Sequence, residues 1–182
     1  MGSKNHQQRL VDFHTKIGLI VMIEAFLDPI RLYSGASWPP LKQAADFYCS
    51  CLSLVVHLFP LLYHDNAFVV SCAVNMGNAS ATLPMLEEFF KHQERFYHYE
   101  RRHLSKASIV DNILNFTSGI LGNSYHNVLK SGFQRAFKYE ASRGVYGTPS
   151  FFLNGFYLHD AGASTDFTGW TNFIDPLIAA SD

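Results

Sequence analysis

The chain has 182 residues, of which 48% are hydrophobic, and its formal net charge is −1. This length is typical of one domain with a sizeable core. A near-neutral charge without a long run of one sign argues against binding nucleic acid or a membrane surface. No apolar run approaches the roughly 20 residues that cross a bilayer. Three cysteines are too few for a disulfide framework, and the polar start MGSKNHQQRL resembles no signal peptide. We therefore expect reduced thiols and a cytoplasmic protein.

The first third of the chain predicts a strand, a helix and a second strand. Residues 17–28 are apolar and rich in β-branched side chains, as in a strand that is buried on both faces. Residues 32–50 have the apolar spacing of a helix, and residues 52–59 again resemble a strand. If the helix is a crossover, the two strands are parallel and form a βαβ unit.

The middle of the chain predicts a block of helices. His64-Asp65-Asn66 offers capping side chains for a helix that ends near Met76. A second helix is expected over about 81–97. Ser108 is a plausible cap for a third helix over about 109–119, and a fourth is expected over about 124–139.

The end of the chain predicts a β-hairpin and a last helix. Asn154-Gly155 is a strong hairpin signal, because a type I′ turn needs positive φ at both central residues. Strands are therefore expected over 150–153 and 156–159. A final helix begins near Asp166, with an apolar stripe of Trp170, Phe173, Ile174, Leu177 and Ile178. These elements fit a mixed sheet covered by helices.

The order of these elements resembles the thioredoxin fold of DsbA-type disulfide oxidoreductases. Gly147-Thr148-Pro149, just before the hairpin, lies where that family has its cis-proline loop. The resemblance spans residues 15–180 and implies an α/β thioredoxin-like fold with a mixed central sheet and an all-helical insertion. It divides the chain into a thioredoxin-like domain, 1–62 and 124–182, and an inserted helical subdomain, 63–123.

The resemblance also shows a departure at the expected redox site. The family's two cysteines align with Arg31 and Ser34, and Pro39 stands five residues after Ser34, as in thioredoxins. Dithiol chemistry needs a thiolate and a resolving thiol, and neither residue supplies one. We therefore expect a redox-inactive homologue of disulfide isomerases.

Two features of such a site can still bind a ligand. The resemblance implies that Thr148, just before Pro149, pairs its backbone with an extended peptide or with glutathione. Arg31 and Ser34 lie at a helix N-terminus, where a guanidinium adds a planar fork for a carboxylate. The alternative is that Arg31 is a solvent-facing residue on a decayed site, because a cation at a helix N-terminus is electrostatically disfavoured.

A second branch of the fold, the kappa-class glutathione transferases and related isomerases, carries a motif like Asp-x-x-Ser-Pro-Tyr-Ser. Here Asp28, Tyr33 and Ser34 match it, and Arg31 replaces the serine that activates the thiol. A guanidinium favours a thiolate, so glutathione is a candidate ligand or co-substrate. A third alternative is a partner-docking module that keeps only a vestigial site.

Glu24 lies in the middle of the first predicted strand, where an unpartnered carboxyl is costly. It is either a remnant of the buried acid that thioredoxin-fold proteins use for proton transfer, or a side chain at the edge of the sheet that reaches water. Cys49 and Cys51 are two apart near a helix end, and Cys72 lies in an apolar stretch, where a thiol behaves as a small hydrophobe. The sequence contains neither His-Glu-x-x-His nor Cys-x-x-Cys, so no metal site is expected.

Overall fold

The computed structural model describes residues 20–64, 66–75, 79–97, 103–121 and 143–179. Their core is a four-stranded sheet with the order β2-β1-β3-β4. β1 (Val21–Leu27) and β2 (Leu52–Leu58) are parallel and joined by helix α2 (Leu32–Tyr48). β3 (Ser150–Leu153) pairs antiparallel to β1, and β4 (Phe156–Tyr157) antiparallel to β3. The predicted βαβ unit and mixed sheet are confirmed.

The two faces of β1 belong to different layers, because successive side chains of a strand point to opposite sides. Ile23, Ala25 and Leu27 belong to the main core, together with Trp38 of α2 and Trp170 of the last helix, α8 (Phe167–Ala179). The opposite face carries a second cluster of buried residues: Phe26, Phe59, Leu61, Val145 and Phe152. The predicted apolar stripe of the last helix is therefore the face that α8 presents to the sheet.

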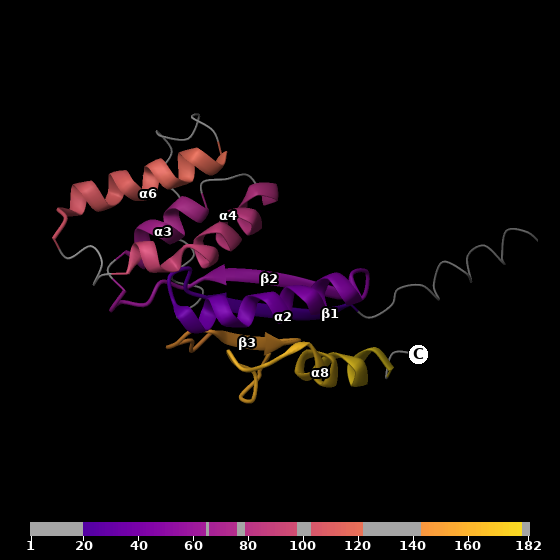
Figure 1. The fold of residues 1–182 in the computed structure, drawn as a ribbon. Helices are drawn as coiled ribbons and strands as arrows, with labels where there is room; N and C mark the ends of the chain where they lie inside the picture. Colours follow the sequence, from indigo (N-terminus) through magenta and orange to yellow (C-terminus); the bar gives the residue numbers. More distant parts are fainter. Residues whose placement is uncertain (1–19, 65, 76–78, 98–102, 122–142, 180–182) are drawn as a thin grey trace, which may run out of the picture.

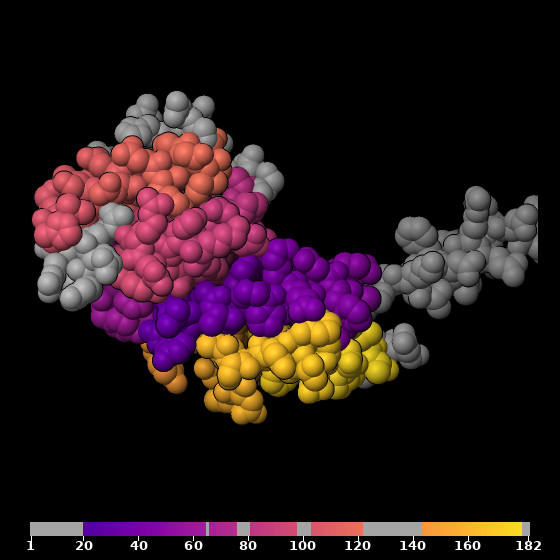
Figure 2. All heavy atoms as spheres, in the orientation of Figure 1, coloured from indigo at the N-terminus to yellow at the C-terminus, as the bar shows by residue number. Residues whose placement is uncertain are grey.

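A block of helices lies on one side of the sheet. It consists of α3 (Ala67–Val74), α4 (Ala79–Lys91), the 3-10 helix η1 (Gln93–Phe96) and α6 (Lys106–Leu121), and α3, α4 and α6 pack on one another. Figure 1 shows this block beside β2, with β3 and α8 on the opposite side of β1. In the space-filling view the block sits at one end of the molecule and abuts the segment of α2 (Figure 2).

Asn66 is the N-cap residue of α3, as predicted, and Asp65 lies outside the described residues, whereas the predicted cap Ser108 is wrong. The Asn66 side chain makes no capping hydrogen bond; it donates instead to the carbonyl of Phe96, 2.9 Å away, and so ties the start of α3 to η1. Ser108 lies inside α6, and its backbone N–H donates to the hydroxyl of Ser105 at 3.1 Å. Ser105, directly before α6, therefore accepts the bond that an N-cap side chain accepts. Both serines have the side chain of a good N-cap, so the sequence alone did not distinguish them.

Other helix and strand boundaries also differ from those predicted. The first strand begins at Val21, the second predicted helix is divided between α4 and η1, and β4 ends at Tyr157. Asn154 and Gly155 have φ values of 48° and 86°, the positive angles that the predicted hairpin turn requires. The predicted helix over 124–139 lies outside the described residues. No helix among the described residues is long and apolar enough to cross a bilayer.

Candidate functional site

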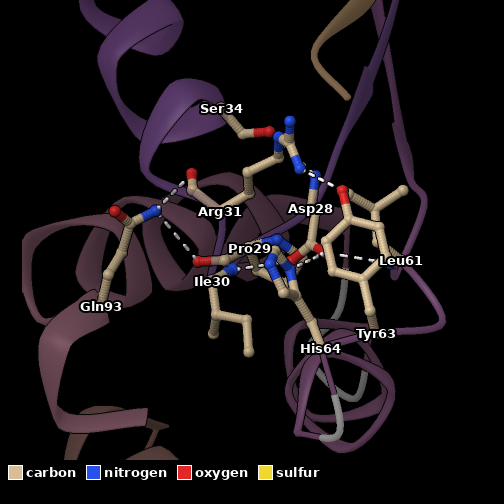
Figure 3. Close-up of polar contacts among 9 residues, drawn as sticks. All are labelled: Asp28, Pro29, Ile30, Arg31, Ser34, Leu61, Tyr63, His64 and Gln93. Carbon is tan, nitrogen blue, oxygen red and sulfur yellow. Dashed lines mark hydrogen bonds and ion pairs between the residues drawn. The ribbon is translucent and has the colours of Figure 1, made fainter. Parts of the chain in front are cut away.

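The loop between β1 and α2 is organised around the carboxylate of Asp28, which is fully buried. Its Oδ1 accepts the backbone N–H of Ile30 at 2.9 Å. Its Oδ2 accepts the backbone N–H of Leu61 at 2.9 Å and lies 2.8 Å from Nδ1 of His64 (Figure 3). Asp28 therefore holds the start of α2 against the segment after β2. In the sequence Asp28 is recognisable only as part of the transferase-like motif, and this role was not predicted.

Ser34 faces inward rather than towards a ligand. It is fully buried, and its hydroxyl oxygen accepts the backbone N–H of Asp28 at 3.2 Å. Its carbonyl accepts the hydroxyl of Ser37 at 2.9 Å. A hydroxyl in this arrangement fixes the loop onto the first turn of α2. Ser34 therefore has a structural contact, and its buried side chain offers no surface to a ligand.

Arg31 lies at the N-cap of α2, where it is half-buried. One of its terminal nitrogens donates to the hydroxyl of Tyr63, and its guanidinium carbon lies 5.4 Å from the ring centre of Tyr33 and 5.9 Å from that of Tyr63. Figure 3 shows the guanidinium and the Tyr63 hydroxyl pointing towards each other. Two aromatic rings at these distances stabilise a cation.

The backbone of Arg31 is held from the helical block. The side-chain amide of Gln93, in η1, donates to the carbonyl of Arg31 at 2.9 Å. Gly35 leaves room for this amide, because a Cβ at position 35 would lie 2.8 Å from the Gln93 nitrogen. The insertion thus contributes directly to the position of Arg31.

A cavity of about 400 Å³ opens beside this cluster. Its walls come from the start of α2, the segment after β2 and the end of η1, and they consist of Ile30, Arg31, Leu32, Tyr33, Tyr63, His64, Asn66 and Tyr97. The volume lies within the range of small-molecule sites, roughly 300–1,000 Å³. Burial raises the pKa of Tyr97, with a smaller contribution from Glu94, so its phenol stays a hydrogen-bond donor. We call this space the Arg31 cavity.

The Gly147–Pro149 loop does not line the Arg31 cavity. The Thr148-Pro149 peptide bond is cis. Thr148 is only 4% exposed, and its hydroxyl has no hydrogen-bond partner among the described residues, whereas Pro149 is partly exposed. Of the six residues predicted for the site, Arg31 and Tyr33 meet in this cavity, and Ser34, Glu24, Thr148 and Pro149 do not.

Glu24 is buried and partnered, so the interpretation that it reaches water at the sheet edge is wrong. One carboxylate oxygen accepts Nη2 of Arg143 at 2.8 Å, and the other lies 3.3 Å from Nε2 of His57. Burial lowers the pKa of His57, against the opposing effect of the hydrogen bond to Glu24. Glu24 is central to the sheet because β2 and β3 flank β1 on both sides, and the sequence alone could not supply its partners.

None of the three cysteines lies at the Arg31 cavity. Cys49 and Cys51 are exposed in the turn after α2, at the end opposite to Arg31, so neither is a core residue. Cys72 is partly buried in α3, and burial raises its pKa to about 11. Within the described ranges, no group of three or more histidine, cysteine or acidic side chains is placed to hold a metal ion.

The sequence matches no protein-family model and no curated protein. Its structure is similar to several solved structures. A Pseudomonas syringae protein described as a candidate protein-disulfide isomerase has a TM-score of 0.71 and 15% identity, over 86% of this chain and 94% of that one. The catalytic domain of Proteus mirabilis ScsC has a TM-score of 0.62 and 15% identity, over 95% and 98%.

A third similar structure is DsbA2 from Pseudomonas aeruginosa, with a TM-score of 0.54 and 18% identity, over 88% of this chain and 90% of that one. At identities this low, the structural similarity establishes the fold and leaves the activity open. The likeness covers 86–95% of this chain in these three cases. The chain therefore has the thioredoxin-like fold of the DsbA-like proteins, with its all-helical insertion.

Proposed function

We propose that this protein binds a peptide or a small thiol ligand in the Arg31 cavity and carries out no dithiol chemistry. The observation that carries the proposal is the guanidinium of Arg31, which lines a cavity of small-ligand size at the N-terminus of a 17-residue helix. Positive ends of helices and guanidinium groups both favour carboxylates. A ligand that carries a carboxylate would therefore suit the part of the cavity that Arg31 lines.

The absence of dithiol chemistry is supported by the residues that stand at the family's cysteine positions. Arg31 has no nucleophilic atom, and the Ser34 hydroxyl is buried against the backbone of Asp28. The Gly147–Pro149 loop remains a predicted second contact for an extended peptide. Because Thr148 is buried, that contact would require the loop to open.

A glutathione-dependent transferase or isomerase is a second candidate, favoured by Arg31 at the position of the thiol-activating residue. A partner-docking surface is a third, favoured by the exposed apolar rim of the cavity: Leu32, Tyr33 and Tyr63 are each more than half exposed. Exposed aromatic and aliphatic side chains beside a cavity are common at protein interfaces.

Calorimetric titration with reduced glutathione tests the proposal. We expect saturable binding that weakens tenfold or more in Arg31→Ala, a loss of about 1.4 kcal/mol that is typical of a charge-assisted hydrogen bond. Arg95→Ala is the matched control, because Arg95 is exposed and does not line the cavity. Absence of binding by the folded wild-type protein at millimolar glutathione would contradict a small thiol ligand and favour the docking surface. Reduction of an insulin disulfide should be undetectable.

A further inference from the structure

A histidine and a buried aspartate, His64 and Asp28, form a hydrogen-bonded pair at the wall of the Arg31 cavity. His64 is one of its lining residues, and its Nδ1 lies 2.8 Å from the buried carboxylate of Asp28. The His64 side chain is 25% exposed, whereas that of Asp28 is fully buried. Figure 3 shows the imidazole against the Asp28 carboxylate, below Arg31 and Tyr63.

The carboxylate fixes the tautomer of the imidazole. Nδ1 must donate its proton to Asp28, because an ionised carboxylate only accepts hydrogen bonds. Nε2 then carries a lone pair. It has no hydrogen-bond partner within the part of the chain that the structure describes. The contact with the carboxylate also holds the ring in place.

We propose that Nε2 of His64 accepts the proton of a thiol bound in the Arg31 cavity, with Asp28 as its positioning residue. This proposal rests on the proposed function and narrows it to a thiol peptide of the glutathione type. In the step, the S–H bond breaks and its proton moves to Nε2. The sulfur keeps the electron pair as a thiolate, which the guanidinium of Arg31 stabilises. No oxidant or reductant is needed.

A thiol suits this pair better than an alcohol does. The ordinary pKa of a thiol is about 8.5, within two or three units of that of imidazole. A nearby cation lowers the pKa of the thiol and so makes the two values more similar. An alkyl hydroxyl is far less acidic and would act only as a hydrogen-bond donor. The protein would thus activate the thiol of a ligand, in place of the two cysteine thiols that its own sequence lacks at positions 31 and 34.

The competing explanation is that His64 only clamps the loop to Asp28. That role already has two backbone donors, Ile30 and Leu61, and it does not depend on an imidazole with a free nitrogen at the cavity wall. The two explanations differ in what happens to the ligand. A clamp leaves the protonation of a bound thiol unchanged.

The test compares glutathione with S-methylglutathione, which has the same peptide but no thiol proton. Wild-type protein should bind both, and ultraviolet absorption of the thiolate should show that bound glutathione ionises at least tenfold more readily than free glutathione. In His64→Gln, the enhanced ionisation of bound glutathione should be lost, and S-methylglutathione measures the part of the binding that involves no thiol proton. His159→Gln, an exposed histidine on the hairpin, is the control and should behave as wild type.

A measurement without a variant guards against misfolding of His64→Gln. The imidazole ¹⁵N resonances of the wild-type protein should show Nε2 becoming protonated when glutathione is added at neutral pH, and not when S-methylglutathione is added. The titratable or charged groups that contact the imidazole or line the cavity beside it are Asp28, Arg31, Tyr33, Tyr63 and Tyr97.

Three outcomes are decisive. Enhanced ionisation that depends on His64, with protonation of Nε2, supports the proposal. Binding of both ligands with ionisation unaltered in His64→Gln, or with Nε2 unprotonated, overturns the acid–base role and leaves the proposed binding function intact. Failure of the wild-type protein to bind either ligand overturns both the acid–base role and the proposed binding of a small thiol ligand.

Discussion

The Asp28→Ala substitution should destabilise the protein by about 3–5 kcal/mol. The carboxylate accepts two backbone N–H groups, of Ile30 and Leu61, and both contacts are buried. Each buried donor left without an acceptor costs about 1–3 kcal/mol. His64 loses its partner as well, but its imidazole is partly exposed and can turn to water. The sum is a large share of the 5–15 kcal/mol that holds a typical domain folded.

Urea unfolding monitored by circular dichroism measures this loss. With a slope of about 2 kcal/mol/M, the unfolding midpoint should fall by about 1.5–2.5 M. Asp46→Ala is the matched control, because Asp46 is an exposed aspartate that pairs with Lys42 at 2.9 Å. An exposed ion pair contributes at most about 1 kcal/mol. His64→Gln should also cost little, because Asp28 keeps both backbone donors.

A loss below about 1 kcal/mol in Asp28→Ala, with the slope unchanged, would refute this reasoning. It would mean that water reaches the two amides once the carboxylate is removed. Equal losses in Asp28→Ala and His64→Gln would refute it in another way, because they would make the imidazole contact, and not the backbone contacts, the main stabilising interaction.

Two further predictions follow from the pKa shifts. Because burial raises the pKa of Cys72 to about 11, its thiol should react with Ellman's reagent at pH 8 much more slowly than the two exposed cysteines, and a single rate for all three would contradict this. Burial, followed by the hydrogen bond to Asp175, raises the pKa of Tyr48 from 10.0 to about 12. The neutral phenol therefore contributes stability that is complete below pH 10 and is lost as the pH rises towards 12. Tyr48→Phe should reduce this loss in alkaline urea titrations, whereas Tyr146→Phe, at a fully exposed position, should not.

Local sequence signals predicted the sheet and its hairpin well. The strand pattern of residues 21–27 reflects burial on both faces, whereas residues 52–58 form a partly buried edge strand that pairs parallel to it. Asn154-Gly155 fixed the hairpin because few residue pairs adopt two positive φ values. Boundaries were less predictable. Ser105 and Ser108 offer similar capping chemistry, and only packing decides between them.

The candidate site was only half predictable, because its walls come from three segments far apart in the sequence. Arg31 and Tyr33 were found through the resemblance, but Tyr63, His64 and Tyr97 carried no motif. His64 was interpreted as part of a helix cap. Its actual partner, Asp28, is 36 residues earlier in the chain. The signal that could have found it is a buried aspartate after a central strand, which must have partners elsewhere.

The surroundings of Arg31 bear on whether the site is a remnant. A cation at the N-cap opposes the helix dipole, so a residue left by decay should turn into water. Instead the Arg31 side chain is half-buried, donates to the Tyr63 hydroxyl and lies near two tyrosine rings. Its carbonyl accepts the side-chain amide of Gln93 from the helical block, where a Cβ at position 35 would lie 2.8 Å from the Gln93 nitrogen. A decayed site needs none of these contacts. Their convergence on one residue supports the proposal that the guanidinium is positioned for a ligand, and the binding experiment with Arg31→Ala measures how much that positioning contributes.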